Sequence, residues 1–261
     1  MGKGFAVRLA ICSSKGGVGK TATAANLAVA LGTKGRTLAV DADPQDSLGR
    51  AFGIIAGHAD SLAGVLEDSG TDVRGILRHG VAPGVDLLPA HPSLEAVGVA
   101  LAQQGGLVTS IKRALRPISA TYDYIVIDTH GDAGNLTLAA IAASDSVVTV
   151  FTSDPGSALG AVRMASFLQT HREFENTNAS LLGVLCSNWD RQGAAAREVA
   201  QALAQTQLPI FDTRIPFSRR VASATLAKRP VTLSAPTSSV AQAYVGLTDE
   251  ILTAYREVLA A

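Results

Sequence analysis

The sequence predicts an α/β fold in which an open, doubly wound and mostly parallel sheet carries helices on both faces. Two observations support this prediction. Short apolar runs alternate with helical patterns along the whole chain, which is the order of a sheet built from consecutive β-α-β units. The runs are continuously apolar and do not alternate with polar residues, as expected for parallel strands that are covered on both faces.

The expected elements follow one another without interruption. Apolar runs predict strands at 5–12, 37–40, 86–88, 124–127, 146–151 and 181–186, and an edge strand at 209–211. Helical patterns at 21–31, 93–104, 136–143, 157–171 and 192–205 supply the crossovers. Because no repeat, low-complexity block or linker separates these elements, we expect residues 1–261 to form a single domain.

The composition is that of a compact folded protein. Hydrophobic residues make up 47% of the chain and charged residues 17%. Lys plus Arg and Asp plus Glu both number 22, so any contact with nucleic acid would need a local basic patch. The distant Cys12 and Cys186 argue against a zinc site or a disulfide framework. No apolar run reaches the roughly 18–20 residues that cross a bilayer, so we expect a cytoplasmic protein.

A glycine-rich turn, SSKGGVGKT at 13–21, lies between the first expected strand and the first expected helix. In such a turn, backbone N–H groups converge on phosphate oxygens and the helix N-terminus adds a partial positive charge. Lys20 would reach the β- and γ-phosphates, and the Thr21 hydroxyl would bind Mg²⁺. The alternative is a flexible turn without a ligand, which does not explain Gly-Lys-Thr in frame between a strand and a helix.

Within this turn, KGGVGKT resembles the deviant Walker A loop of the ParA/MinD group of P-loop ATPases, and the chain is identified as a ParA/Soj-type member. The resemblance implies that the early lysine, Lys15, reaches across a dimer interface to the nucleotide of the other subunit. A cation supplied in this way couples nucleotide state to dimer state, because phosphoryl transfer depends on charge placed against the transition state. Lys15 and Lys20 are thus the expected catalytic cations. The implied ligands are ATP and Mg²⁺, and the implied binding residues are Lys15, Gly16, Gly17, Val18, Gly19, Lys20, Thr21 and Ala22.

The segment VDADPQ at 40–45 resembles the D-x-D-P-Q segment of the same family. Asp43 would orient or activate the attacking water, and Asp41 would support the magnesium shell, since carboxylates suit both tasks. The alternative is an ordinary Asp-Pro turn before a helix. The segment follows the glycine-rich turn at the spacing of one β-α-β unit, which favours a catalytic role over an ordinary turn. The family usually continues with Gly-Asn, whereas this chain has Asp46-Ser47, so we expect the segment to behave differently.

The apolar run at 124–127 ends in Asp128, which matches a Walker B acid that holds Mg²⁺ through water. Family members commonly continue D-T-P-P or D-C-P-P, but here Thr129 is followed by His130 and Gly131. Without these two prolines, we expect this turn to be less rigid than in the family. His130 is a candidate base, but Asp43 already fits the role of orienting water, so we interpret His130 as a loop residue in place of a proline.

Three later segments give weaker resemblances to the family. They are SDPGSALGA at 153–161, LLGVLCSNWDR at 181–191 and IPFSRRVASATLAKRPV at 215–231. They imply that Asn188 and Pro216 lie beside the nucleotide base. For Asn188 the alternative is a simple cap at the end of a strand.

A cluster of cations without an intervening acid lies between 214 and 229 and consists of Arg214, Arg219, Arg220, Lys228 and Arg229. In ParA-type proteins the corresponding region helps to form a basic face that binds DNA without sequence preference, an effect that two copies in a dimer would multiply. The alternative is an ordinary solvated helix and loop. The resemblance implies an ATP-dependent homodimer on non-specific DNA, with slow hydrolysis stimulated by a ParB-like or other cargo-bound protein. Its expected role is DNA segregation or cargo positioning at the bacterial nucleoid.

Other functions on this fold are less consistent with the sequence. A MinD-like membrane switch needs a terminal helix with a basic face, but the charges of the last segment are Asp249, Glu250, Arg256 and Glu257. We therefore expect that helix to pack on the protein and expect no membrane partner. A cluster-transfer ATPase needs paired thiolates, which the two cysteines do not supply. A ligase or kinase with a small-molecule acceptor remains an alternative.

Overall fold

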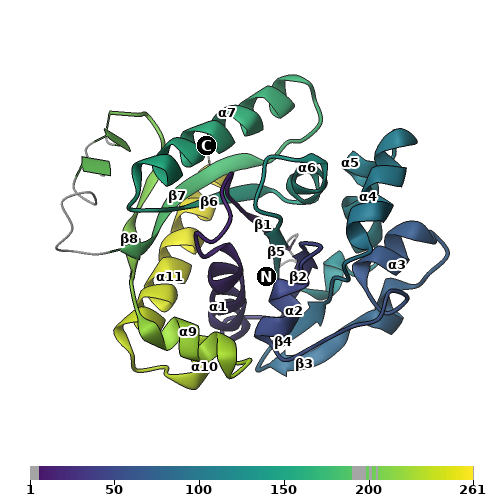
Figure 1. Cartoon of the computed structure of the whole chain (residues 1–261), viewed down its shortest axis with the longest axis horizontal. Helices are drawn as coiled ribbons and strands as arrows, with labels where there is room; N and C mark the ends of the chain where they lie inside the picture. The colour runs from purple at the N-terminus through teal and green to yellow at the C-terminus, as the bar shows by residue number, and fades with distance from the viewer. Residues whose placement is uncertain (1–5, 190–197, 200–201, 204, 261) are drawn as a thin grey trace.

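The computed structural model describes residues 6–189, 198–199, 202–203 and 205–260. In this part of the chain, one eight-stranded sheet has the order β3-β4-β2-β5-β1-β6-β7-β8 (Figure 1). All neighbouring strands are parallel except β3 and β4. The strands are β1 Val7–Cys12, β2 Thr37–Ala42, β3 Arg78–Ala82, β4 Val85–Leu88, β5 Tyr124–Thr129, β6 Ser146–Thr152, β7 Ser180–Trp189 and β8 Ile210–Pro216.

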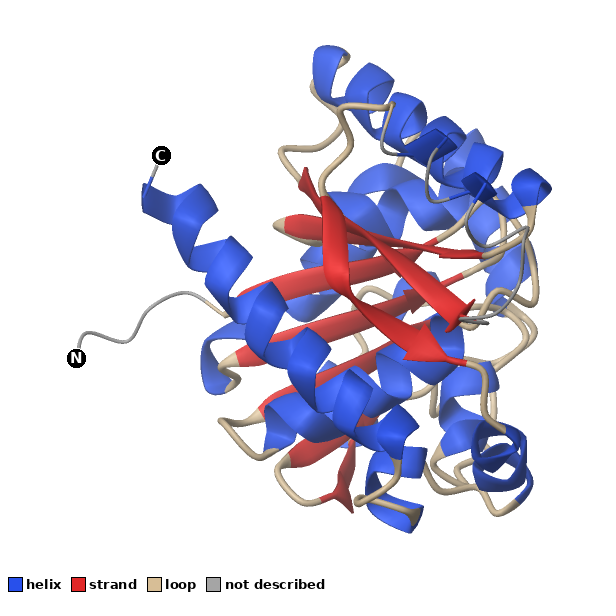
Figure 2. Ribbon diagram, turned by 90° about the vertical axis from the view of Figure 1, so that its left-hand side faces the viewer, coloured by secondary structure: helices blue, strands red, loops and turns tan. Residues whose placement is uncertain are grey.

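Helices cover both faces of this sheet (Figure 2). Leu9 and Ile11 of β1 pack into a core cluster with α1 and α11, whereas Ala10 and Cys12 contribute to a cluster with α6 and α7 on the other face. This alternation of faces confirms the doubly wound α/β prediction. The helices are α1 Lys20–Gly32, α2 Ser47–Ala51, α3 Leu62–Glu67, α4 Leu94–Gln103, α5 Leu107–Leu115, α6 Asn135–Ala142, α7 Pro155–Glu173, α9 Arg219–Leu226, α10 Val231–Ser234 and α11 Ser239–Ala260, with 3-10 turns at Val73–Ile76 and Ser119–Thr121.

The expected strands all occur, but the sequence missed β3 and several short helices. The sequence of β3, RHGVA, is largely solvent-accessible and contains Gly80 with a φ of 65°, so it has neither a continuous apolar run nor a regular alternation. The expected edge strand at 209–211 is β8, which extends further, to Pro216. The expected helix at 192–205 lies mostly outside the described residues, as does Phe5 at the start of the first expected strand.

The last helix, α11, packs along α1 and β8. Its apolar positions Val240, Tyr244, Leu247 and Ile251 are all buried, which confirms the expected packing of this segment on the protein. Its amphipathic face is therefore already covered. Among the residues that the structure describes, no helix has both the length and the apolar content that crossing a membrane requires.

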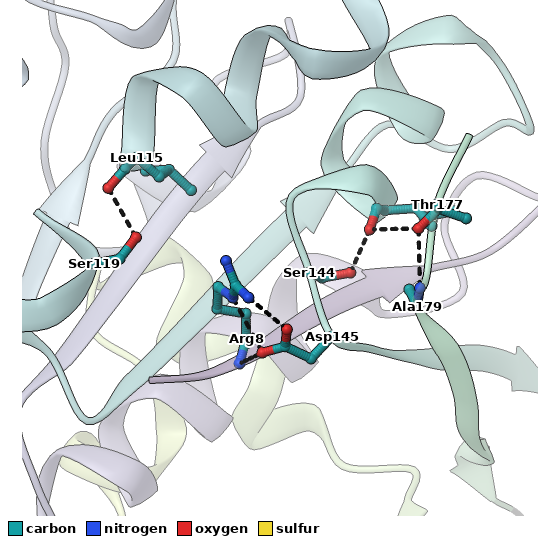
Figure 3. Close-up of polar contacts among 8 residues, drawn as sticks. Arg8, Leu115, Ser119, Ser144, Asp145, Thr177 and Ala179 are labelled. Carbon is teal, nitrogen blue, oxygen red and sulfur yellow. Dashed lines mark hydrogen bonds and ion pairs between the residues drawn. The ribbon is translucent and has the colours of Figure 1, made fainter. Parts of the chain in front are cut away.

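The amino ends of the central strands are joined by a fork-shaped ion pair (Figure 3). Arg8 of β1 donates from Nη2 to Asp145 Oδ1 at 2.6 Å and from Nε to Asp145 Oδ2 at 3.1 Å. Its backbone N–H also donates to Asp145 Oδ2, at 3.1 Å. This set of hydrogen bonds raises the pKa of Arg8. Because Asp145 directly precedes β6, the pair aligns β1 with β6 and so sets where their carboxyl ends lie.

We expect Asp145→Asn to lower the free energy of unfolding by about 1–2 kcal/mol, because it weakens a bidentate, charge-assisted set of hydrogen bonds. The matched control is Asp249→Asn, which breaks a single exposed pair with Lys34. Its cost should stay below about 0.5 kcal/mol. Urea unfolding of both variants measures the difference. Equal losses would show that the fork contributes no more than a surface ion pair.

Candidate functional site

The candidate site lies at the edge where the parallel strands end. β1 leads into the glycine-rich turn, β2 into Asp43, β5 into His130, β6 into Asp154, and β7 ends beside Asn188. In an open parallel sheet, ligands bind at this edge because the loops that follow the strands converge there. The order of the strands therefore collects side chains that are far apart in the sequence.

The glycine-rich turn is held closely against its neighbours. Lys20 is 7% exposed and donates from Nζ to Ser13 Oγ at 3.1 Å. Gly19 has a φ of 97°, a left-handed conformation that favours glycine, and a Cβ atom there would approach Ser187 Oγ to 2.8 Å. Val18 packs its side chain into the core, which leaves only its backbone for a ligand.

A cavity of about 800 Å³ lies in front of this turn, a size that suits a nucleotide. It brings together the glycine-rich turn, the segment after β2, the turn after β5 and the end of α9. Lys20 and Ala22 are among the residues that line it, and the sequence did not point to Arg50, Leu226 or Lys228 as lining residues. The lining residues are Gly16, Gly17, Gly19, Lys20, Thr21, Ala22, Asp43, Gln45, Ser47, Arg50, Ala51, Gly53, Ile55, His130, Gly131, Thr225, Leu226 and Lys228.

Asp41 is fully buried and supports the segment that follows it. Its Oδ1 accepts from the Asp43 N–H at 3.2 Å and its Oδ2 accepts from the Gly49 N–H at 2.9 Å. Burial, and then the nearby Asp128, raise the pKa of Asp41 well above its ordinary value. Asp41 thus holds the 43–49 segment against the end of β2, and its predicted support of a magnesium shell remains a prediction.

Asp128 is the buried acid most in need of a ligand. Its side chain is 0% exposed, and neither carboxylate oxygen has a hydrogen-bond partner among the described residues. Burial raises the pKa of Asp128 to about 7, and the nearby positive charge of Lys20 opposes this rise. An unsatisfied buried carboxylate is costly, and a hydrated divalent cation would satisfy it. Thr21 and Asp128 therefore fit Mg²⁺ and would hold it.

Asp43 points into the cavity from the end of β2, and its Oδ1 takes two hydrogen bonds. The Gln45 N–H donates to it at 2.9 Å, and His130 Nδ1 lies 2.9 Å from the same oxygen. The sequence analysis weighed His130 as a candidate base and interpreted it as a loop residue in place of a proline. It missed the contact because the two residues follow β2 and β5, which become neighbours only in the folded sheet.

Lys15 does not line the described part of the cavity. Its Nζ lies 2.9 Å from Asp154 Oδ1, and the two side chains are 52% and 44% exposed. Asp154 also accepts from the Ser157 N–H at 2.9 Å and so caps α7. The Thr152 hydroxyl, and then Lys15, keep the pKa of Asp154 low. The sequence did not single out Asp154, although it stands in the segment SDPG that was compared with the family.

Asn188 and Pro216 lie at the ends of neighbouring strands, next to Ser187 and outside the lining of the described cavity. Asn188 is exposed and has a φ of 52°. Trp189 pairs with Pro216, and the Arg214 guanidinium lies 4.2 Å from the centre of the Trp189 ring. The structure thus places both residues at the edge of the sheet where the parallel strands end, and their contact with a base stays a prediction.

The predicted DNA-binding residues are exposed and, in the part of the chain that the structure describes, form no ion pair with an acid. They do not form one uniform patch. Arg219 and Arg220 begin α9, and Lys228 and Arg229 follow its end. Arg214 stacks on Trp189, while Lys228 lines the cavity. Lys228 therefore belongs to the cavity as well as to the basic segment.

The two cysteines are buried and free. Burial raises the pKa of Cys12 to about 12 and that of Cys186 to about 11. Thiols of this kind are poor nucleophiles and poor metal ligands, because both roles need the thiolate. The described residues also contain no group of three or more His, Cys, Asp and Glu side chains arranged to hold a metal ion.

Comparison with known proteins agrees with this geometry. Residues 7–181 match a family described as an AAA domain. The chromosome-partitioning ATPase Soj of Thermus thermophilus is 35% identical over 257 residues, which cover 96% of this chain and 97% of that protein. Apo McdA of Cyanothece superposes with a TM-score of 0.84 at 25% identity, covering 94% of this chain and 99% of that one.

A third similar protein was solved with ligands. Cobyrinic acid a,c-diamide synthase of Mycobacterium smegmatis, with bound ADP and magnesium, has a TM-score of 0.80 at 26% identity and covers 96% of each chain. These similarities agree with the glycine-rich turn that carries Lys15 and Lys20 and with the buried Asp128, and they lead to one assignment. The chain belongs to the ParA/Soj family of P-loop ATPases, whose phosphate-binding loop is of the deviant Walker A type.

Proposed function

We propose that this protein is a ParA-type ATPase that cycles between a monomer and an ATP-bound homodimer. The dimer binds DNA without sequence preference, and a ParB-like or other cargo-bound protein stimulates its slow hydrolysis of ATP. The observation that carries this proposal is the placement of two lysines from one turn: Lys20 lines the cavity, whereas Lys15 is held outside it by Asp154. The cavity thus has its own phosphate lysine and leaves a second one at the surface.

The residues of the cavity divide the chemistry of hydrolysis among them. Lys20 and the backbone of the turn would hold the phosphates, and Thr21 with Asp128 would hold Mg²⁺. When bound, the metal ion neutralises charge that develops on the phosphate oxygens. The hydrogen bonds that the described residues make to Asp43 fall on Oδ1, which leaves Oδ2 for the attacking water.

Lys15 can leave Asp154 at little energetic cost. Both side chains are about half exposed, and exposed ion pairs contribute roughly 0–1 kcal/mol. A phosphate in a closed, water-poor interface is a stronger partner, because charge-assisted hydrogen bonds gain strength there. Formation of the dimer would therefore exchange the Asp154 contact of Lys15 for the nucleotide of the other subunit.

The basic segment provides the output of this switch. Arg219, Arg220 and Arg229 are exposed, and the neighbouring Lys228 lines the nucleotide cavity. A nucleotide that orders Lys228 would also order the end of α9 and the arginines beside it. The Soj relative is named as a chromosome-partitioning ATPase, which supports a role in segregation or positioning of cargo on the bacterial nucleoid.

Lys15→Ala should weaken ATP-dependent dimerisation at least about tenfold, a change of 1.4 kcal/mol. The monomer should still bind ATP, because Lys20 and the turn are intact. Light scattering after gel filtration with Mg²⁺ and a slowly hydrolysed analogue measures the dimer, and Lys112→Ala, an exposed lysine on α5, is the matched control. A Lys15→Ala variant that dimerises like wild type would exclude the role across the interface.

Asp43→Ala should reduce ATP hydrolysis about 100-fold or more, as expected when a general base is lost. The ATP-bound dimer should persist, because neither lysine is changed. Phosphate release and gel filtration are measured on the same samples, with Asp132→Ala as a control aspartate that does not line the main cavity. Rapid turnover by Asp43→Ala would remove Asp43 from the catalytic residues.

The double variant Arg219→Ala, Arg220→Ala should bind DNA more weakly. The slope of log affinity against log salt concentration should become shallower by an amount that corresponds to about two phosphate contacts per subunit. Arg163→Ala on α7 is the control, since it removes an exposed arginine elsewhere. Co-sedimentation with DNA is measured with ATP, with ADP and with a slowly hydrolysed analogue. Equal binding in all three states, or none in any, would contradict the switch.

A further inference from the structure

His130 contributes a side chain to the cavity at a position where the related loop sequences have a proline. Its Nδ1 lies 2.9 Å from Asp43 Oδ1, and that oxygen also accepts from the Gln45 N–H at 2.9 Å. Both His130 and Asp43 line the cavity. The imidazole therefore contacts the carboxylate to which the proposed function assigns the reacting water.

The backbone around His130 is fixed from several sides. The preceding Thr129 donates from Oγ1 to the Ile11 carbonyl at 2.9 Å, which ties the end of β5 to β1. On the other side, a Cβ atom on Gly131 would lie 3.2 Å from Gly16 Cα and 3.4 Å from Lys20 Nζ. The turn thus packs directly on the phosphate-binding loop, so the imidazole is presented from a well-supported position.

The hydrogen bond to Asp43 fixes the orientation of both side chains. A carboxylate oxygen accepts and a ring N–H donates, so the contact requires a hydrogen on Nδ1 of His130. Two donors on Oδ1, one from the backbone and one from His130, determine the rotation of the Asp43 carboxylate. With the Gln45 N–H alone, the carboxylate would be free to turn about that single contact.

We propose that His130 is a positioning residue for ATP hydrolysis: its Nδ1–H holds Asp43 Oδ1 so that Oδ2 is directed at the attacking water. This inference rests on the proposed ATPase function. Orientation of this kind affects turnover and not ground-state binding, because the water must be aligned only as the phosphoryl group is transferred. A residue that merely fills the turn would affect folding and leave turnover unchanged.

The test compares His130→Ala with His130→Asn in the full-length protein. Single-turnover hydrolysis at saturating MgATP and nucleotide affinity are measured separately. His130→Ala should slow hydrolysis about tenfold while changing nucleotide affinity less than about twofold, as expected for loss of one hydrogen bond to a catalytic group. His130→Asn should recover most of the rate, since its Nδ2 can donate from nearly the position of Nδ1.

Two controls separate positioning from general damage. His79→Ala removes a histidine whose Nδ1 lies 3.0 Å from Asp86 Oδ2 at the far edge of the sheet, and it should hydrolyse ATP like wild type. In an Asp43→Ala background, His130→Ala should cause no further loss, because its effect passes through Asp43. If His130→Ala does not fold, as judged by circular dichroism, the rate of His130→Asn is compared with that of His130→Gln, whose longer side chain should not restore the contact.

The outcomes are distinct. Four results would overturn the positioning role while leaving the ATPase proposal intact. They are a wild-type rate in His130→Ala, equal slowing in the Ala and Asn variants, equal rates in the Asn and Gln variants, and further slowing when His130→Ala is added to Asp43→Ala. A wild-type protein that does not hydrolyse ATP, or an Asp43→Ala variant of normal activity, would instead overturn the proposed function and this inference with it.

Discussion

The pairing of β1 with β5 on one side and with β6 on the other is the interaction on which the site depends. Parallel hydrogen bonding fixes the stagger of these strands, so the ends of all three strands are fixed relative to one another. Those ends carry the phosphate-binding turn, Asp128 and Asp154. Thr129 Oγ1 adds a hydrogen bond to the Ile11 carbonyl at 2.9 Å at the very end of β1. A shift by one residue would turn each of these side chains to the opposite face.

Charge is distributed unevenly around this edge. Asp41 and Asp128 are buried, and among the described residues neither forms an ion pair. The buried Lys20 donates to Ser13. Burying carboxylates is unfavourable unless their lone pairs are used. Asp41 uses its oxygens on backbone N–H groups, whereas those of Asp128 have no such partner. The protein thus carries an electrostatic cost at Asp128 that a cation would remove, which favours the liganded form.

The sequence predicted what depends on neighbours in the chain. The glycine-rich turn, Asp43 and Asp128 each follow an apolar run, and their chemistry can be interpreted from local order alone. The contacts of His130 with Asp43 and of Lys15 with Asp154 join loops that meet only after the strands are arranged. Strand β3 was missed because it is largely exposed and has no continuous apolar run. Lys228 belongs both to the basic segment and to the lining of the cavity. This depends on how the end of α9 packs near the cavity, and the sequence has no signal for it.

The carboxylate of Asp154 accepts from Lys15 Nζ, and it also caps α7 by accepting from the Ser157 N–H. The Thr152 hydroxyl and the Ser157 N–H would remain on Asp154 after Lys15 leaves. In the proposed exchange, departure of the lysine would therefore leave the cap of α7 in place. A side-chain rearrangement of this kind is complete within nanoseconds. Under the proposed dimer cycle, the exchange of this contact would therefore not limit how fast subunits associate and dissociate.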